Sequence, residues 1–109
     1  MSGRGRSLEE RIAEELLKRF RGFFASRRDG LVLVKLDVGG RTVMVWVRGS
    51  PITERALRLY DKVVSRHHFD EAVLLKLRRE ADYVSYADLE KRFGKVILSP
   101  DELVGACPS

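Results

Sequence analysis

Residues 31–48 read LVLVKLDVGGRTVMVWVR, and this stretch decides the fold. Both halves are rich in β-branched and aromatic residues and contain no proline, which predicts one strand before the glycines and one after them. The Gly39–Gly40 pair can adopt the positive φ values of a tight two-residue turn. The stretch therefore predicts an antiparallel hairpin whose register is set by the turn, with Val38 opposite Arg41.

This register gives the hairpin two unlike faces, because directly opposed residues share a face. One face is aliphatic and requires a core. The other mixes an indole, a thioether and cations, which suits a surface that stacks bases and holds phosphates. Alternatively, a helix or a second subunit covers the mixed face and Trp46 is an ordinary core residue; in an oligomer both interpretations can hold. The aliphatic face comprises Val32, Val34, Leu36, Val38, Val43, Val45 and Val47, and the mixed face comprises Leu31, Leu33, Lys35, Asp37, Thr42, Met44, Trp46 and Arg48.

Length and composition indicate one small cytoplasmic domain. A chain of 109 residues is one domain by the usual prior, which we place at 7–104, after a disordered basic arm at 1–6 and before a tail at 105–109. No apolar run is long enough to span a membrane, and no secretory leader is visible. The single cysteine, Cys107, cannot form an internal disulfide. The chain has no Asn or Gln although 34% of its residues are charged, which is typical of hyperthermophiles, archaeal ones included.

The net charge of +5 is unevenly placed along the chain. Residues 1–55 contain 12 Lys or Arg and 7 Asp or Glu, whereas residues 56–109 contain 9 of each. This asymmetry favours a polyanionic partner, with nucleic acid first and an anionic membrane surface second.

The remaining pattern predicts helices and two further strands. Ser7 and Glu10 form a capping box at the start of a helix that we expect to end near Gly22 or Ser26, with Phe20 and Phe24 on its buried face. We expect a second helix from Ser50–Pro51 to about His67, a strand at 71–77, a helix from Ser85 to Gly94, a strand at 95–99 and a last helical turn. The fold class is therefore α+β, with a mixed four-stranded sheet, made of the antiparallel hairpin and strand–helix–strand units, packed with three helices and a short C-terminal helical turn.

The candidate binding residues combine the mixed hairpin face with the most basic and aromatic segment of the chain. Trp46 is expected to stack on a base, beside Met44, and Lys35, Arg41 and Arg48 to pair with phosphates. Phe23 lies off the apolar helix face, so it is a candidate for contact. The predicted nucleic-acid-binding set is Phe23, Arg27, Arg28, Lys35, Arg41, Met44, Trp46 and Arg48.

No motif indicates catalysis, a cofactor or a metal. The adjacent pair His67–His68 points about 100° apart on a helix, so the two rings cannot easily share an ion. Gly39–Gly40 is a turn rather than a phosphate loop, because no Gly-Lys-Ser/Thr follows it. We therefore expect a non-catalytic protein without cofactors.

The order of elements from Leu8 to Val104, closing on KVILSPDEL at 95–103, resembles the core of Mrr-type restriction endonucleases. Those nucleases hold a divalent metal with an acid on the first hairpin strand and an acid and a lysine, two residues apart, on the second. Here the second strand has no carboxylate and Asp37 stands alone on the first. The resemblance therefore implies a nuclease scaffold that has lost its site and serves as a partner subunit.

As a small, basic, thermophile-like chain, the whole protein also resembles the ThermoDBP-related group of archaeal single-stranded DNA-binding proteins. This resemblance implies a homo-oligomer, a dimer or tetramer, that binds single strands with little sequence preference through a basic and aromatic cleft. Single-stranded DNA, or RNA, is the partner that we expect.

Overall fold

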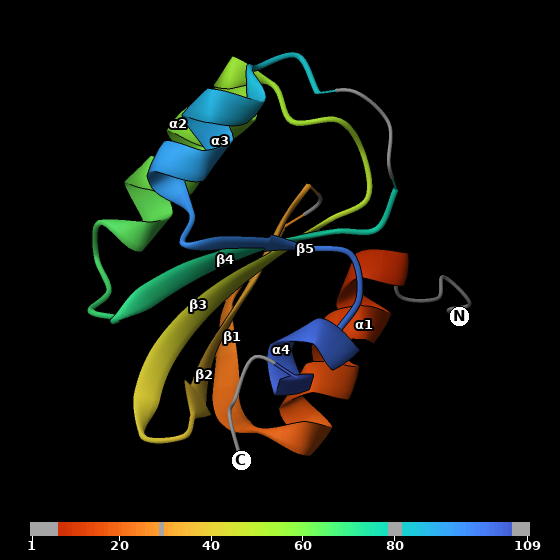
Figure 1. Cartoon of the computed structure of the whole chain (residues 1–109), viewed down its shortest axis with the longest axis vertical. Helices are drawn as coiled ribbons and strands as arrows, with labels where there is room; N and C mark the ends of the chain where they lie inside the picture. The colour runs from red at the N-terminus through yellow and green to blue at the C-terminus, as the bar shows by residue number, and fades with distance from the viewer. Residues whose placement is uncertain (1–6, 29, 79–81, 106–109) are drawn as a thin grey trace.

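The computed structural model describes residues 7–28, 30–78 and 82–105. One mixed sheet of five strands lies between two pairs of helices, with α2 and α3 on one face and α1 and α4 on the other (Figure 1). The predicted arm at 1–6, the tail beyond residue 105 and Cys107 lie outside the described residues. No helix in the described ranges is long and apolar enough to cross a membrane. The elements are α1 (Leu8–Arg19), β1 (Arg21–Arg28), β2 (Leu31–Val38), β3 (Arg41–Arg48), α2 (Glu54–Val64), β4 (Glu71–Lys76), α3 (Tyr86–Arg92), β5 (Lys95–Ile97) and α4 (Asp101–Gly105).

The strands lie in sequence order, β1-β2-β3-β4-β5. The first three form an antiparallel meander, and β4 and β5 run parallel to β3. The predicted hairpin register is confirmed, with Val38 opposite Arg41 and Val32 opposite Val47. Gly39 and Gly40 both have positive φ, as the two-residue turn requires.

The first strand was not predicted, so the expected four-stranded sheet has five strands. The segment read as the end of the first helix leaves the helix at Arg19 and pairs with β2. Gly22 makes this possible, because a Cβ there would lie 2.1 Å from the carbonyl oxygen of Lys35. A β-bulge interrupts the pairing between Phe24 and Ser26. Beyond the bulge the two sides of the strand are exchanged, so Arg28 rather than Arg27 shares a side with Phe23.

The helix caps are partly as predicted. The Ser7 hydroxyl accepts a hydrogen bond from the Glu10 N–H, as the capping box predicted, and the Ser85 hydroxyl caps α3 in the same way by accepting one from the Asp88 N–H. The second helix begins later than expected, because Thr53 is its N-cap and Ser50–Pro51 belong to the preceding loop.

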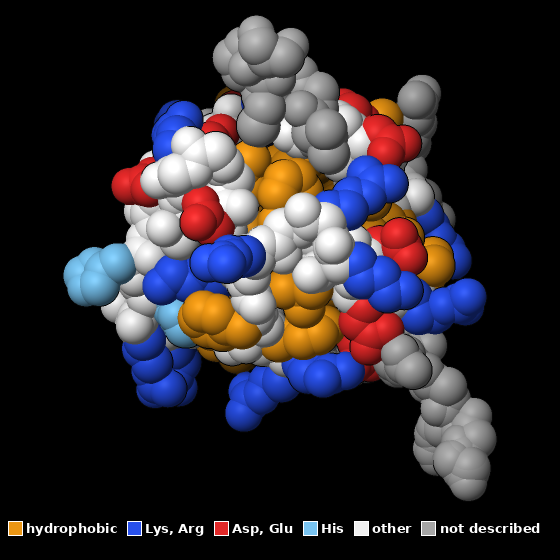
Figure 2. All heavy atoms as spheres, turned by 90° about the horizontal axis from the view of Figure 1, so that it is seen from below, with side chains coloured by type: hydrophobic (Ala, Val, Ile, Leu, Met, Phe, Trp, Pro, Cys, Tyr) orange, Lys and Arg blue, Asp and Glu red, His pale blue; other side chains and the backbone are white. Residues whose placement is uncertain are grey.

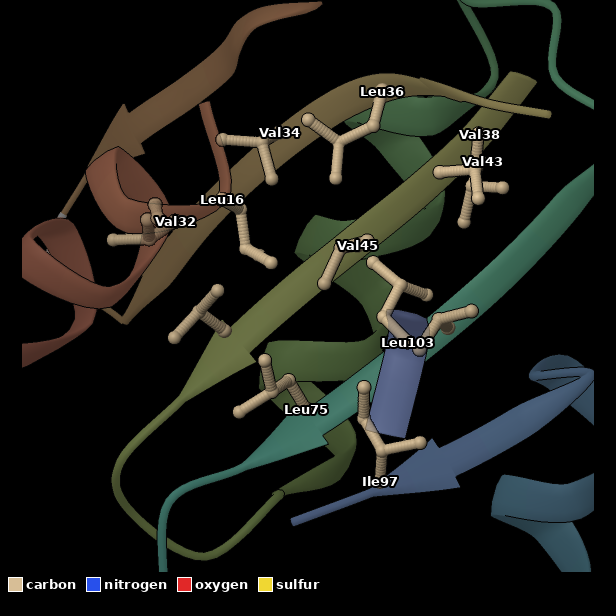
Figure 3. Packing of buried hydrophobic residues seen from close by; sticks show 13 residues of the cluster. Leu16, Val32, Val34, Leu36, Val38, Val43, Val45, Leu75, Ile97 and Leu103 are labelled. Carbon is tan, nitrogen blue, oxygen red and sulfur yellow. The ribbon is translucent and has the colours of Figure 1, made fainter. Parts of the chain in front are cut away.

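The aliphatic face of the hairpin lies against α1 and α4 (Figure 3). Ala13 and Leu16 of α1 and Leu103 of α4 are buried against valines and leucines of the sheet. The sequence pattern predicted this core correctly, including Phe20 and Phe24, which pack at its margin.

The mixed face is also a core, and it lies beneath α2 and α3. Tyr60 of α2 and Leu89 and Phe93 of α3 bury the same sheet face as Trp46. The chain therefore covers this face with its own helices, which was the alternative left open by the sequence. The buried members of this second cluster are Leu31, Leu33, Met44, Trp46, Ile52, Ala56, Leu57, Tyr60, Ala72, Leu74, Leu89 and Phe93.

Candidate nucleic-acid interface

Trp46 and Met44 do not form an exposed stacking surface, and this part of the predicted site is wrong. Both side chains are 0% exposed. The Trp46 ring stacks on Tyr60 with 4.9 Å between centroids and 12° between planes. Its Nε1–H donates to the carbonyl oxygen of Gly30 at 3.2 Å. Contacts within the chain therefore bury the apolar surface of the indole and provide an acceptor for its N–H.

Arg48 holds the backbone around the end of β3 rather than presenting its charge to a phosphate. Its Nη1 donates to the Gly30 carbonyl at 2.7 Å, its Nη2 to the Pro51 carbonyl at 2.8 Å and its Nε to the Ser50 carbonyl at 3.1 Å. These three bonds engage each nitrogen of the guanidinium. The predicted phosphate contact of Arg48 is therefore replaced by a structural role.

Two more predicted cations form ion pairs. The Arg27 guanidinium lies on the α1 side of the sheet, 3.2 Å from a Glu10 oxygen and 3.5 Å from a Glu14 oxygen. Arg41 lies at the turn of the hairpin, 3.7 Å from Glu71. Both arginines remain partly exposed, but each is already balanced by an acid.

Of the other three predicted residues, Phe23 and Lys35 form a cross-strand pair, and Arg28 lies five residues further along β1. All three lie on the same side of the sheet as α2, with Phe23 and Arg28 on the edge strand β1 and Lys35 on β2. Phe23 is 53% exposed, and the Lys35 Nζ lies 5.9 Å from the centre of its ring. The bulge in β1 places Arg28 on this side as well.

A groove of about 500 Å³ runs between β1 and α2. Its cationic side chains are Arg28 from β1 and Lys62 and Arg66 from the end of α2 and the turn that follows it, beside Arg27. Arg28, Lys62 and Arg66 are exposed, and no described acid forms an ion pair with any of them. The described lining, which contains neither Asp nor Glu, is Ala25, Ser26, Arg27, Arg28, Leu59, Lys62, Val63, Arg66 and His67.

Sequence reasoning missed Lys62, Arg66 and His67, although one signal was present. Arg58, Lys62 and Arg66 follow one another at spacings of four. Like charges at this spacing oppose helix formation. The signal is weak, however, because Asp61 lies between Arg58 and Lys62, and Arg66 follows the end of α2 at Val64.

A separate, smaller hollow of about 220 Å³ lies on β1, β2 and β3. Phe23, Lys35, Asp37 and Thr42 contribute to its lining, with Arg21 at the edge. His67 connects the two, because it lines the groove and its ring centre lies 6.5 Å from that of Phe23. Figure 2, a view from below the molecule of Figure 1, shows hydrophobic side chains near the middle with Lys and Arg side chains, and also Asp and Glu side chains, around them.

The groove on the other side of α2 differs in charge. It lies between α2 and α3, and its lining combines Glu54 and Asp88 with Arg58, Lys91 and Arg92. Arg92 is moreover paired with Asp61 at 2.5 Å. The groove beside β1 is therefore the more strongly basic of the two.

One buried tyrosine has a displaced pKa. Burial raises the pKa of the Tyr60 hydroxyl well above its ordinary value, and the neighbouring Asp61 adds to this effect while Arg92 opposes it. The displacement follows from the core position of Tyr60 beneath Trp46 and Phe93. Among the residues that the structure describes, no group of three or more His, Cys, Asp or Glu side chains could hold a metal ion.

Comparison of the chain with protein-family models, with curated proteins and with solved structures finds no match in any of the three. Function is therefore argued from the groove and the hollow themselves.

Proposed function

We propose that this chain is a non-catalytic protein that binds single-stranded nucleic acid, DNA first, along the groove between β1 and α2. The observation that carries the proposal is the group of three exposed cations, Arg28, Lys62 and Arg66, in a groove without a described acid. Cations held together in this way repel one another and bind a polyanion with release of its counterions. The affinity would come mainly from phosphates, with little dependence on base sequence.

A single strand fits this surface better than a duplex. His67 lines the groove, and its ring centre lies 6.5 Å from that of the exposed Phe23. A single strand has unpaired bases to stack on such a ring, whereas the bases of a duplex are paired and stacked on one another. Arg21 and Lys35 line the hollow beside the ring, together with the acid Asp37, and bring the number of phosphate contacts to about five at most.

The test is a fluorescence anisotropy titration of labelled single-stranded DNA, single-stranded RNA and duplex DNA at several salt concentrations. For about three to five phosphates, log K should fall against log[salt] with a slope of roughly −2 to −3.5 for single strands. Absence of binding to all three polymers at low salt would overturn the proposal.

A charge-matched pair of variants locates the site. Lys62→Ala with Arg66→Ala should weaken binding and reduce the salt slope by about 1.4, because each lost phosphate contact removes about 0.7. The control is Arg11→Ala with Lys18→Ala, which removes the same charge from exposed positions of α1 on the other face of the sheet. Equal losses in the two double variants would mean that net charge, not the groove, drives binding.

A catalytically inactive nuclease-fold scaffold, acting as a partner subunit, is the second candidate. One observation favours it: Asp37 is the single carboxylate on β2 and β3, and its Oδ1 accepts a hydrogen bond from the Gly40 N–H at the turn. Incubation with labelled single strand or duplex and Mg²⁺ or Mn²⁺ should give no cleavage. Cleavage that is lost on Asp37→Ala would overturn the non-catalytic part of both candidates.

A further inference from the structure

An exposed phenyl ring stands at the junction of the groove and the hollow. Phe23 is more than half exposed, whereas Phe20, Phe24, Phe69 and Phe93 all lie partly or fully in the two cores. Burial of a phenyl ring is favourable, and the exposed part of Phe23 does not contribute this free energy to folding. A ligand that covers the ring would recover that free energy.

We propose that the hollow on β1, β2 and β3 receives one unpaired nucleobase, which stacks on the Phe23 ring. This inference rests on the proposed function and specifies its ligand: one base of the bound strand enters the hollow while the neighbouring phosphates lie in the groove. Lys35 borders the base, since it lines the hollow and its Nζ lies near the same ring.

The distances favour stacking on one side of the ring. A base between two parallel rings needs about 7 Å from one ring to the other, because each stacked contact is about 3.5 Å. Phe23 and His67 are 6.5 Å apart and tilted by 43°, so they form no parallel slot. His67 instead supports Phe23 from one side and leaves the other side to the ligand.

Lys35 does not close the site. Its Nζ is 5.9 Å from the ring centre, at the outer limit of a cation–π contact. Such a contact is weak, so a base can replace it at little cost. The ammonium can then donate a hydrogen bond to a base carbonyl or pair with the adjacent phosphate.

The β-bulge is an independent feature that points to the same site. It follows Phe24 directly and brings Arg28 to the side of the sheet that carries Phe23. Bulges next to binding sites commonly redirect side chains in this way. The result is one side of the sheet that carries the Phe23 ring, Lys35 and, five residues further along β1, Arg28.

The experiment compares an oligothymidylate with an oligonucleotide of the same length whose residues are all abasic. The unmodified protein should bind the base-containing strand more tightly, and Phe23→Ala should weaken that binding roughly 5- to 150-fold, the effect of one lost stacked base. Binding of the abasic strand should not change in Phe23→Ala, and the salt slope should stay the same for both strands. Phe23→Tyr, which keeps an aromatic ring, should retain most of the affinity.

Tyr83→Ala is the matched control, because Tyr83 is an exposed aromatic residue, at 76%, that lines the other groove. It should leave both affinities unchanged. If the unmodified protein binds abasic and base-containing strands equally, the base site is overturned while the proposed function stands. If it binds neither, both fail.

Discussion

At the scale of single residues, Trp46 shows what the pattern of one strand can and cannot decide. Alternation placed it correctly on the face opposite the valines. Whether that face is covered depends on a helix that lies further along the chain, and the apolar stripe of that helix was only partly predicted. The spacing of apolar residues in the second helix predicts a buried stripe that includes Leu59, but Leu59 is exposed and Leu57 is buried instead. The hairpin sequence alone therefore could not predict whether Trp46 is buried or exposed.

Replacement of the buried indole should act on stability. Trp46→Ala should lower the free energy of unfolding by about 3–5 kcal/mol, because it leaves a cavity beneath Tyr60 and Phe93. Trp46→Phe should cost less, since a ring remains to stack. Denaturant unfolding followed by circular dichroism measures both. A stable Trp46→Ala protein that has lost only nucleic-acid binding would contradict the core position.

Tyr60 should make the fold sensitive to alkali. Its pKa is raised in the folded chain, so its contribution to stability is complete below the unfolded value of about 10 and is lost as pH rises above that value. Once the unfolded tyrosine is ionised, the loss is about 1.4 kcal/mol per pH unit. Tyr60→Phe should therefore lose less stability than the unmodified protein above about pH 10, in denaturant titrations at a series of pH values.

The control for this pH effect is Tyr83→Phe, at an exposed position. At each pH, the change in stability of Tyr83→Phe should equal that of the unmodified protein. A similar gain in both variants would mean that tyrosine burial is not the cause.

At the scale of elements, β1 is the main difference between sequence and structure. Phe20 and Phe24 are four residues apart and fit a helix, and Arg, Gly, Ala and Ser are weak strand formers. Pairing with β2 over seven positions outweighs these local preferences. The hairpin, by contrast, could be predicted residue by residue, because its two-residue turn fixes the register locally.

Gly22 should be indispensable to this strand. Gly22→Ala would bring a methyl group against the backbone oxygen of Lys35, which cannot move without disturbing β2. We expect a loss on the order of 1–3 kcal/mol in denaturant unfolding. Gly94→Ala is the comparison, because its new methyl group would meet only the flexible side chain of Glu71, at 3.0 Å. An unaffected Gly22→Ala protein would argue against the β1–β2 pairing.

The bulge should separate the effects of two adjacent arginines. Arg28→Ala should weaken single-strand binding and reduce the salt slope by about 0.7, because Arg28 faces the groove. Arg27→Ala should change binding less and cost up to about 1 kcal/mol of stability, because Arg27 pairs with Glu10 and Glu14 on the α1 side. Anisotropy titration and unfolding of both variants distinguish these effects. If Arg27→Ala weakened binding more than Arg28→Ala, Arg27 rather than Arg28 would face the groove, and the bulge would not lie between Phe24 and Ser26.

At the scale of the whole molecule, the positive surface charge is not concentrated where the sequence concentrates its Lys and Arg residues. The sequence assigns the excess positive charge to the first half, but Arg19, Arg27 and Arg41 of that half pair with acids. The Arg19 partner, Asp101, is 82 residues away, so such pairing could not be read from local spacing. The groove instead combines cations from both halves of the chain.

A homo-oligomer remains a prediction at this scale. Two β1 edges brought together would face arginine with arginine, so we expect assembly through another surface. Tyr86 is exposed and offers one. Light scattering should give a dimer or tetramer, and Tyr86→Arg should reduce its mass if this surface is used. A monomer at all concentrations would end the prediction.

The bulge also makes one residue dispensable. Ala25 has no partner on β2, while its neighbours Phe24 and Ser26 pair with the consecutive residues Val34 and Leu33. Excision of Ala25 would leave every cross-strand pair intact and straighten the strand. The contour of the groove could then be altered without changing its charge, whereas Lys62→Gln with Arg66→Gln would remove charge and keep side chains of similar length in the lining. Shape and electrostatics, usually inseparable in a binding site, could here be tuned one at a time.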